Sequence, residues 1–219
     1  NAIIAGLTFL VATLMLMSVR LGYLSSMMKK LREINEKLLE KELELQNINS
    51  VLNDMAMRDP LTHLHNRRAM IPLIDEAFRR SNRYGTAACL ILCDIDHFKR
   101  INDRHGHQTG DAALIFVAQQ LINTVRASDS VARWGGEEFL ILLPETTLEN
   151  GTLLAEKIRA HIAAGRFLQG EHHITVSASV VALGAGMSFN ACFDALDAAL
   201  YDAKAAGRNR VNVARNAAA

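Results

Sequence analysis

The feature that most constrains the fold is an apolar stretch at the start of the chain. Residues 2–19 carry no charge, and a helix needs about 20 apolar residues to cross a membrane. Arg20 and three more basic residues at positions 29–32 follow the stretch, whereas a secretory signal peptide has its positive charges in front. We therefore predict a transmembrane helix over residues 1–23, with the following chain on the cytoplasmic side. A buried helix of a soluble protein, or the start of a coiled coil, is the alternative.

The next segment, residues 24–58, has the repeat of a coiled coil. Glu and Lys fill its outer positions, and Lys41 interrupts its apolar seam. The seam residues are Leu24, Met27, Leu31, Ile34, Leu38, Leu45, Ile48, Leu52 and Met55. Spacings that alternate between three and four are typical of a coiled coil rather than of a globular helix, so we predict a parallel dimer through this segment. A single solvated amphipathic helix is the alternative.

The remaining chain has the pattern of a separate domain. Helical periodicity ends at Pro60, because proline disfavours helix in the residue before it, and we place the domain at residues 59–213 with a tail over 214–219. We expect helices at 66–84, 110–126, 148–164 and 189–206, and strands at 87–95, 130–134, 139–143, 174–183 and near Val211. Because these elements mix without a strict βαβ alternation, they indicate an α+β fold with helices packed on a sheet.

Composition excludes several other classes of protein. A hydrophobic fraction of 50% is too high for a disordered chain, and a net charge of +1 gives no sign of a nucleic-acid partner. The three cysteines, Cys89, Cys93 and Cys192, form no Cys-x-x-Cys pair and lack zinc-finger spacing. We expect them to be reduced, buried thiols.

Two carboxylates follow the most apolar of the predicted strands. Asp94 and Asp96 stand at the end of the strand at 87–95, where side chains emerge into a site. Aspartate oxygens are ligands for Mg²⁺, whose remaining positions are usually filled by phosphates and water. A metal site at this strand end is the functional interpretation, and polar residues entering a loop are the alternative.

A second acidic pair lies in the predicted hairpin. Gly135 and Gly136 permit positive φ in a tight turn, and Glu137 and Glu138 then sit at the hairpin tip. If the hairpin lies beside the strand that ends in Asp94, the carboxylates together form a metal site. An ordinary solvated turn is the alternative.

Two cations lie near the end of the last predicted helix. Lys204 and Arg208 are four residues apart, so they share a helix face, and Gly207 is expected to cap that helix. Two cations on one face suit a triphosphate. Charges that compensate the helix dipole are the alternative.

Together, in this order and spacing, the three segments resemble the GGDEF family of diguanylate cyclases. Residues 135–139 form the GGEEF version of the family's central motif, and residues 94–111 (DIDHFKRINDRHGHQTGD) are very close to the family pattern. Residues 58–62 and 66–68 resemble the signature that opens the domain. The resemblance covers about residues 59–213, and it implies a palm-like antiparallel sheet with surrounding helices, similar to that of nucleotidyl cyclases.

The resemblance also implies an activity. Family members condense two GTP molecules into cyclic di-GMP and two pyrophosphates, with Mg²⁺ or Mn²⁺ as the cofactor. Each domain holds one GTP, so catalysis requires a homodimer, which the coiled coil would hold together. We expect a signalling enzyme of the inner membrane, with its catalytic domain in the cytoplasm and no nucleic-acid partner.

The resemblance assigns roles to individual residues. The Mg²⁺ ligands would be Asp94, the Ile95 carbonyl and Glu137. Glu137 would also accept the proton of the attacking 3′-hydroxyl, with help from Glu138, and Lys99 would stabilise the transition state. The residues that hold the phosphates would be Phe98, Lys99, Lys204 and Arg208.

By the same resemblance, Asn102 and Asp111 would recognise the guanine base. The Asp111 carboxylate can accept two hydrogens from the Watson–Crick edge of guanine. Adenine presents an acceptor at that edge and would leave the carboxylate badly paired, and rejection of that kind can reach about 10⁴-fold.

Arg126 and Asp129 resemble the Arg-x-x-Asp inhibitory site of the family, at the family's spacing from Gly135. Arg126 can stack on a guanine or pair with a phosphate, and Asp129 can accept from guanine N1–H. We therefore predict that cyclic di-GMP is an allosteric inhibitor as well as the product. A surface turn at the end of a helix is the alternative.

Two positions depart from the family pattern, since His63 and Ser179 stand where the family usually has glycine. Neither is a proposed ligand. Three other functions remain open: a domain that binds GTP or cyclic di-GMP without catalysis, a related enzyme that accepts ATP, and a structural coiled-coil stalk. The first usually lacks the acidic motif that this chain retains, Asp111 disfavours the second, and a stalk would not need an acidic site.

Overall fold

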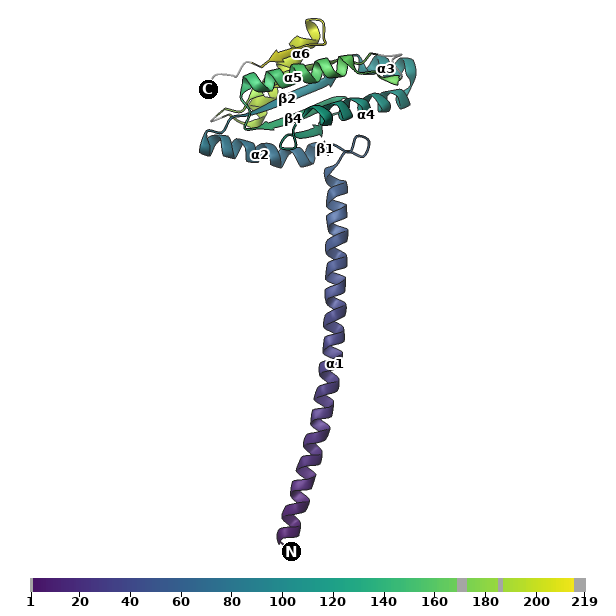
Figure 1. Cartoon of the computed structure of the whole chain (residues 1–219), viewed down its shortest axis with the longest axis vertical. Coiled ribbons are helices and arrows are strands. Elements are labelled where there is room, and N and C mark those ends of the chain that lie inside the picture. Colours follow the sequence, from purple (N-terminus) through teal and green to yellow (C-terminus); the bar gives the residue numbers. More distant parts are fainter. Residues whose placement is uncertain (1, 169–172, 185–186, 215–219) are drawn as a thin grey trace. The chain divides into compact units, whose positions relative to one another are not determined.

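The computed structural model describes residues 2–168, 173–184 and 187–214, without the side chains of residues 2–5 and 49–55. The chain divides into two compact units, Asn1–Asp54 and Met55–Ala219. A continuous helix, α1 (Ala2–Met57), forms the described part of the first unit (Figure 1). It ends shortly before Pro60, because a proline disfavours the helical conformation in the residue before it.

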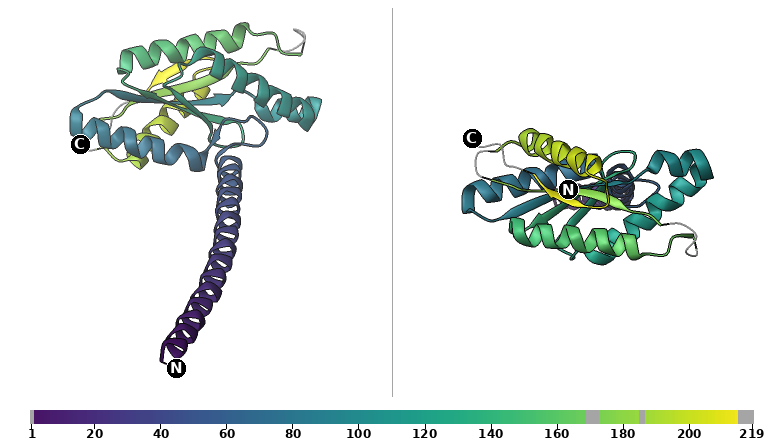
Figure 2. Two further views of the ribbon diagram at one scale, coloured as in Figure 1. Left: turned by 60° about the horizontal axis from the view of Figure 1, so that its bottom comes forward. Right: turned by 90° about the horizontal axis from the view of Figure 1, so that it is seen from above.

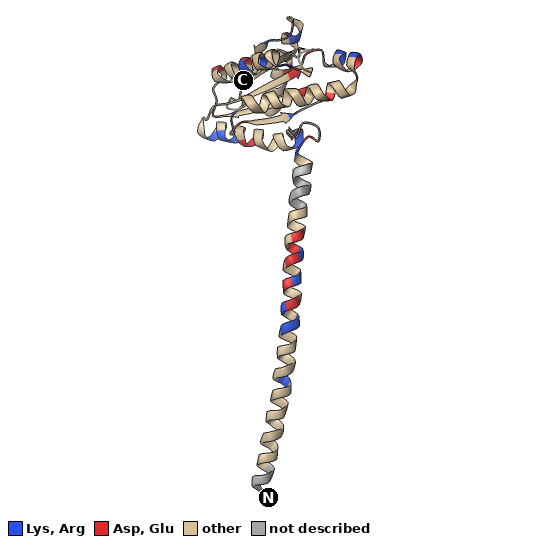
Figure 3. Ribbon diagram, turned by 45° about the vertical axis from the view of Figure 1, so that its right-hand side comes forward, with Lys and Arg blue, Asp and Glu red and all other residues tan. Residues whose placement is uncertain are grey.

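The apolar side chains along α1 are exposed. Those of the predicted seam range from 48% exposed at Ile48 to 62% at Leu38, and the seam positions Leu52 and Met55 lie outside the described side chains. Figure 3 shows that charged residues are absent from the described first part of α1 and concentrated in its second part. By length and composition alone, one helical segment of the described chain, Gly6–Ile48, is long and apolar enough to cross a membrane.

The described residues of the second unit form six strands and five further helices. The strands are β1 (His65–Asn66), β2 (Ala88–Ile95), β3 (Ser130–Arg133), β4 (Glu138–Pro144), β5 (Val176–Ala182) and β6 (Val211–Val213). The helices are α2 (Arg67–Tyr84), α3 (Phe98–His105), α4 (His107–Thr124), α5 (Leu148–Ala164) and α6 (Phe189–Ala205). Most of these elements lie within a few residues of their predicted positions.

The strands form one sheet in the order β1-β3-β4-β2-β5-β6. The four central strands pair antiparallel, but β1 pairs parallel to β3 and β6 parallel to β5. The prediction of an antiparallel sheet is therefore correct for the centre only, and the whole sheet is mixed. A parallel pair needs a long crossover, which α6 provides between β5 and β6 and the segment from α2 to α4 provides between β1 and β3.

Helices cover both faces of the sheet, with α5 and α6 on opposite sides in the right-hand view of Figure 2. On one face α4 and α5 pack against Cys89, Ile91 and Cys93 of β2, and on the other face α2 and α6 pack against Leu90 and Leu92. All eight residues of β2 are buried. A strand covered on both faces needs no polar alternation, which explains its nearly continuous apolar sequence. The cysteines are buried, unpaired thiols, as predicted.

Two elements, α3 and β1, are absent from the sequence prediction. The helix α3 has eight residues, and its two apolar residues, Phe98 and Ile101, lie one turn apart, so its amphipathic pattern spans too few turns to identify a helix from the sequence. β1 has only two residues, and its pairing with β3 defines it as a strand.

The two departures from the family pattern have structural consequences. His63 has a φ of 58°, in the left-handed region that favours glycine, and its carbonyl accepts a hydrogen bond from Arg58 Nη1 at 2.9 Å. Ser179 is fully buried in β5, and its hydroxyl has no hydrogen-bond partner among the described residues. A glycine at the first position would remove backbone strain, and a glycine at the second would remove a buried, unpaired hydroxyl.

Candidate active site

The register between β2 and β4 brings the predicted acidic residues together. Asp94 on β2 lies opposite Glu138, the first residue of β4, and the Ile95 N–H donates to the Glu137 carbonyl at 3.3 Å. Asp94 is buried, with an exposed fraction of 3%. The two acidic segments, which are distant along the chain, therefore meet at one end of two neighbouring strands.

The turn between β3 and β4 holds Glu137 and Glu138 at this place. The N–H groups of Trp134 and Gly135 both donate to the Glu138 carbonyl, at 2.8 and 3.3 Å. Neither Gly135 nor Gly136 has a positive φ, so the expectation of a left-handed glycine turn is wrong, because the connection is longer than the two-residue turns that demand positive φ. A Cβ on Gly135 would lie 2.5 Å from Glu138 Oε2, so a larger residue at this position would displace the Glu138 carboxylate.

Lys204 is the cation of this site, with its Nζ 2.8 Å from Asp94 Oδ2. The pKa of Asp94 is raised to about 6, mainly by burial and further by the charges of Glu137 and Glu138, while Lys204 opposes the shift. Burial also raises the pKa of Glu137, with Lys204 opposing and Glu138 adding to the effect. Asp94 and Glu137 thus both interact with the Lys204 ammonium group, and Glu138 adds a further negative charge beside them.

This donor set fits a divalent cation. Asp94 and Glu137 offer hard oxygen ligands, and the predicted third ligand is the Ile95 carbonyl. Among the described residues, no three His, Cys, Asp or Glu side chains converge as a preformed metal cluster, so the protein alone does not complete a coordination shell. Sites of this kind are usually completed by substrate phosphates and water.

Arg133, which the sequence interpretation missed, braces the acidic turn. Its guanidinium donates to the Gly136 carbonyl at 2.8 Å and to Asp59 Oδ2 at 3.1 Å. Asp59 Oδ1 accepts from both the N–H and the hydroxyl of Thr62, each at 2.8 Å. Burial raises the pKa of Asp59, but the bonds from Thr62 and Arg133 outweigh burial and lower it overall. The signature at residues 58–62 therefore supports the turn that carries the glutamates.

The predicted guanine-reading residues lie where α3 packs on α4. Phe98 is buried at the start of α3, which also carries the exposed Lys99 and, one turn later, Asn102. A Cβ on Gly110 of α4 would overlap the Asn102 amide and lie 3.3 Å from the Phe98 ring. Close packing at this glycine therefore sets the position of the Asn102 side chain, next to the helical turn that carries the exposed Asp111.

The structure separates the two cations near the end of α6. Lys204 lies in the last turn of α6, but the helix ends at Ala205, and Arg208 lies beyond it with a φ of 63°. The prediction that Lys204 and Arg208 share a helix face is therefore wrong. The cause is Gly207, whose φ of 112° turns the chain out of the helix, as a glycine after a helix C-cap commonly does.

Arg126 and Asp129 form a compact turn after α4. The Arg126 N–H donates to Asp129 Oδ2 at 2.9 Å, and the Asp129 N–H donates to the Arg126 carbonyl at 3.0 Å. Both residues line a hollow of about 390 Å³ together with Asn150 and Lys157 of α5. Lys157 adds a second cation, and the sequence interpretation missed it because no local pattern links α5 to the Arg-x-x-Asp segment.

Comparison with known proteins decides the family. A family model described as "Diguanylate cyclase, GGDEF domain" matches residues 56–210. This chain belongs to that family. The matched segment contains the whole acidic site, the α3–α4 packing and the Arg-x-x-Asp turn of this GGDEF domain. Family members with cyclase activity generally depend on a divalent metal ion, which agrees with the oxygen donors around Asp94.

Curated relatives share the domain but are much longer. The chain is 43% identical over 190 residues to diguanylate cyclase DgcP of Pseudomonas aeruginosa, covering 84% of this chain and 28% of DgcP. It is 39% identical over 172 residues to diguanylate cyclase DgcM of Escherichia coli, covering 78% of this chain and 40% of DgcM. The chain thus spans less than half the length of these relatives.

Solved structures of the GGDEF family are similar in fold. The coiled coil and GGDEF domain of DgcB from Caulobacter crescentus, in complex with c-di-GMP, aligns with a TM-score of 0.75 at 32% identity, covering 83% of this chain and 99% of that chain. The active GGEEF domain of a diguanylate cyclase from Vibrio cholerae aligns with a TM-score of 0.65 at 38% identity, covering 68% of this chain and 97% of that chain.

We expect Gly110→Ala to weaken GTP binding by this GGDEF domain without unfolding it. The new methyl group would displace the Asn102 amide, which can move because it is the end of a flexible side chain. The amide would then leave its place in the predicted guanine site. The KM for GTP should rise about tenfold, the effect of losing a hydrogen bond, in a steady-state assay. Gln119→Ala, on an exposed part of α4, is the control, and a parent-like KM in Gly110→Ala would exclude Asn102 from guanine binding.

Proposed function

We propose that this chain is the catalytic part of a membrane-anchored diguanylate cyclase, which converts two GTP molecules into cyclic di-GMP and two pyrophosphates. One observation carries the proposal. The buried Asp94 lies opposite Glu138 and beside Glu137, with Lys204 as the only cation in salt-bridge contact with it among the described residues. A domain that had lost catalysis would not need a buried carboxylate beside two further acidic residues at the end of its central strand.

The proposed reaction forms a bond between the ribose 3′-oxygen of one GTP and the α-phosphorus of the other, and pyrophosphate leaves. Glu137 accepts the proton of the 3′-hydroxyl, and its raised pKa suits a general base. Lys99, Lys204 and Arg208 bind the phosphates, together with the Phe98 N–H at the start of α3, where helix N–H groups are not used within the helix. When bound at Asp94, the Ile95 carbonyl and Glu137, Mg²⁺ would neutralise phosphate charge and lower the pKa of the hydroxyl.

Asn102 and Asp111 select guanine in this proposal. Asn102 and Asp111 lie on either side of the close contact between α3 and α4 at Gly110. This placement supports a common role in base recognition, because a guanine bound at that contact can form hydrogen bonds with the amide and the carboxylate at the same time. Two such sites must face each other for each phosphorus to meet the opposite 3′-hydroxyl, so we propose that the active form is a homodimer.

We propose that α1 supplies both the dimer contact and the membrane anchor. The exposed seam of α1 would be buried in a parallel coiled coil, and the solved DgcB structure also joins a coiled coil to a GGDEF domain. The charge-free first part of α1 and the basic residues that follow it support an inner-membrane span with the catalytic domain in the cytoplasm.

The test is an assay of the purified full chain in detergent or vesicles. GTP and Mg²⁺ should yield cyclic di-GMP, identified by chromatography, and Mn²⁺ should be tried as the alternative cofactor. Parallel reactions with ATP, and with GTP plus ATP, separate a diguanylate cyclase from an enzyme that makes mixed dinucleotides. Binding of GTP without any product, with either metal, would identify a regulatory domain instead.

We propose in addition that cyclic di-GMP inhibits the enzyme at Arg126 and Asp129. The hollow that both residues share with Lys157 supports the proposal, because guanine edges and phosphates need an acceptor and cations in one place. Product bound there would hold the two GTP sites of the dimer apart. The extent of inhibition would then depend on how much more tightly cyclic di-GMP binds the separated arrangement than the arrangement in which the two sites face each other.

We expect Arg126→Ala to release the enzyme from product inhibition. The cyclic di-GMP concentration for half-inhibition should rise at least about tenfold, since a charge-assisted contact is lost, while the initial velocity without added product changes little because Arg126 lies outside the acidic site. Initial rates at increasing cyclic di-GMP measure the effect. Arg79→Ala, an exposed arginine of α2 paired with Glu76, is the control. Unchanged inhibition in both Arg126→Ala and Asp129→Ala would place feedback elsewhere or show that there is none.

A further inference from the structure

Three successive residues after α6 have a left-handed backbone. The φ angle is 112° at Gly207, 63° at Arg208 and 45° at Asn209. Residues with a Cβ rarely adopt this region, and such a conformation persists only where neighbouring groups over-determine it. Because Arg208 is one of the proposed phosphate-binding residues, whatever holds this turn also decides where its guanidinium can reach.

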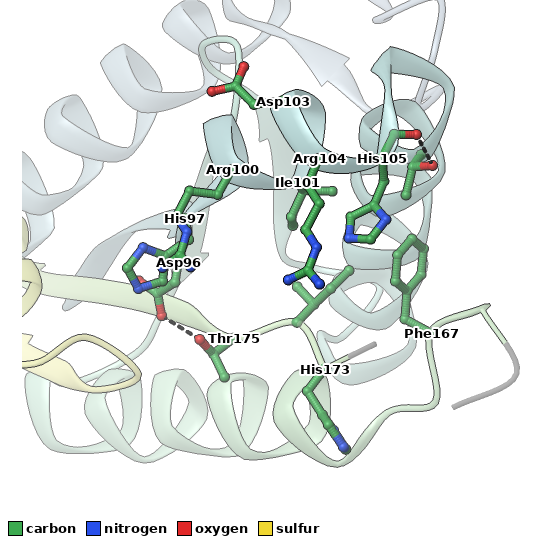
Figure 4. A pocket seen from close by; sticks show the side chains of 12 residues that line it. Asp96, His97, Arg100, Ile101, Asp103, Arg104, His105, Phe167, His173 and Thr175 are labelled. Atoms are coloured by element: carbon green, nitrogen blue, oxygen red, sulfur yellow. Dashed lines mark hydrogen bonds between the residues drawn. The ribbon is translucent and has the colours of Figure 1, made fainter. Parts of the chain in front are cut away.

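The group that holds the turn is the buried carboxylate of Asp96, which is 6% exposed. Its Oδ2 accepts from the Asn209 N–H at 3.0 Å and from the Thr175 hydroxyl at 2.7 Å, and its Oδ1 accepts from the Ser177 hydroxyl at 2.7 Å. Figure 4 shows Asp96 and its bond to Thr175 at one end of a hollow alongside α3. In the sequence, Asp96 shares the strand end that was interpreted as a metal site, and the resemblance to the family gives it no role of its own.

Two further contacts tie the same turn to helices. The Arg208 N–H donates to the Ala203 carbonyl of α6 at 3.0 Å, and Arg159 Nη1 of α5 donates to Asn209 Oδ1 at 2.9 Å. The contact through Asp96 differs from both, because it joins the turn to the end of β2, where the proposed metal ligand Asp94 lies. One strand end therefore places both the carboxylate for the metal and the turn that carries the guanidinium.

We infer that Asp96 is a positioning residue for the phosphates of GTP, which fixes the left-handed turn so that Arg208 is held in place relative to Asp94 and Lys204. The inference rests on the proposed function in that Arg208 binds phosphate. Asp96 acts through Arg208 and not as a metal ligand. Both of its oxygens already accept hydrogen bonds from donors that a cation would have to displace and leave unpaired.

Asp96→Asn in the full chain tests the inference. The amide has nearly the same shape, but it carries no negative charge and only its oxygen can accept, so in either orientation the Asn209 N–H loses its charge-assisted partner. The ligands are the α,β-methylene analogue of GTP, which cannot be cyclised, and GMP, which lacks the β- and γ-phosphates, both with Mg²⁺. We expect the variant to bind the GTP analogue about tenfold more weakly than the parent, as for a lost charge-assisted contact, and to bind GMP as the parent does.

A double-mutant cycle with Arg208→Ala separates positioning from general damage. If Asp96 acts through Arg208, Asp96→Asn adds no further loss of analogue binding in the Arg208→Ala background. If the double variant loses the product of the two single losses in analogue binding, the inference is overturned. It is also overturned if Asp96→Asn binds the analogue as the parent does while Arg208→Ala binds it clearly more weakly. Parent-like binding by Arg208→Ala would instead overturn the phosphate role of Arg208 in the proposed site, and the inference with it.

Arg159→Met is a second variant for the same binding experiment, to be used if Asp96→Asn does not fold. Arg159 is partly exposed on α5, and its replacement removes the side-chain contact to Asn209 while leaving Asp96 intact. The inference predicts a smaller loss for the GTP analogue, about threefold, because the turn keeps its bonds to Asp96 and Ala203, and no loss for GMP. Parent-like binding of the analogue by this variant would overturn the inference.

Discussion

Glu137→Gln is expected to lower cyclase turnover by about 10³-fold or more, within the range that a lost general base produces. The amide is a weaker ligand for a divalent cation than the carboxylate, and it cannot take the proton of the 3′-hydroxyl. The measurement is cyclic di-GMP formed from GTP and Mg²⁺ by the full chain, quantified by chromatography. Production near the parent rate would remove Glu137 from the proposed mechanism.

The same substitution should leave the fold as stable as before, or more stable. Burial and the charge of Glu138 raise the pKa of Glu137, so the ionised form opposes folding at neutral pH, and a neutral glutamine removes that cost. The melting temperature in metal-free buffer should therefore equal or exceed that of the parent. Glu149→Gln, an exposed glutamate in the first turn of α5, is the control for activity and for stability. A lower melting temperature in Glu137→Gln would mean that lost activity reflects a damaged fold.

Inserting four residues after Leu45 is expected to change cyclase activity about tenfold or more, whereas inserting seven should keep it within about twofold of the parent. A seven-residue insertion adds one heptad and preserves the phase of the seam, but a four-residue insertion rotates everything that follows. If α1 sets how two catalytic domains face each other, that rotation moves one GTP away from the other. Specific activity of the full chain in vesicles measures the effect.

The insertions can be matched closely by repeating the chain's own sequence. A copy of residues 42–45 gives the four-residue variant, and a copy of residues 39–45 gives the seven-residue variant, so that composition and helix propensity stay nearly constant. Both variants must be equally dimeric by analytical ultracentrifugation for the comparison to report on geometry. Equal activity of the two would show that α1 acts as a tether without controlling orientation.

The acidic site shows what a local sequence pattern can predict and what it cannot. A strand such as β2, buried on both faces, has to be almost wholly apolar, so carboxylates at its end stand out in the sequence and predict a site. The hairpin glutamates give a weaker signal, because two acidic residues beside two glycines also fit an ordinary solvated turn. Their meeting depends on the register that sets Asp94 opposite Glu138, and the sequence predicted it only through the resemblance to a family. The roles of Gly135 and Arg208 were misjudged, because the first depends on the Glu138 side chain and the second on where α6 ends.

The kinds of helix and strand, the boundary between the long helix and the following domain, and the family could all be predicted from the sequence. These predictions rest on the spacing of apolar residues, on the position of Pro60 and on the spacing of the motifs, which are all properties of residues close together in the chain. Only the tertiary structure decided that Arg133 binds Asp59, that Lys157 joins the Arg126 hollow, and that Asp96 holds the turn at Asn209. Most buried polar groups find a partner, but which partner each one finds depends on which distant segments the folded sheet brings within hydrogen-bonding distance. A local sequence pattern contains no information on that distance.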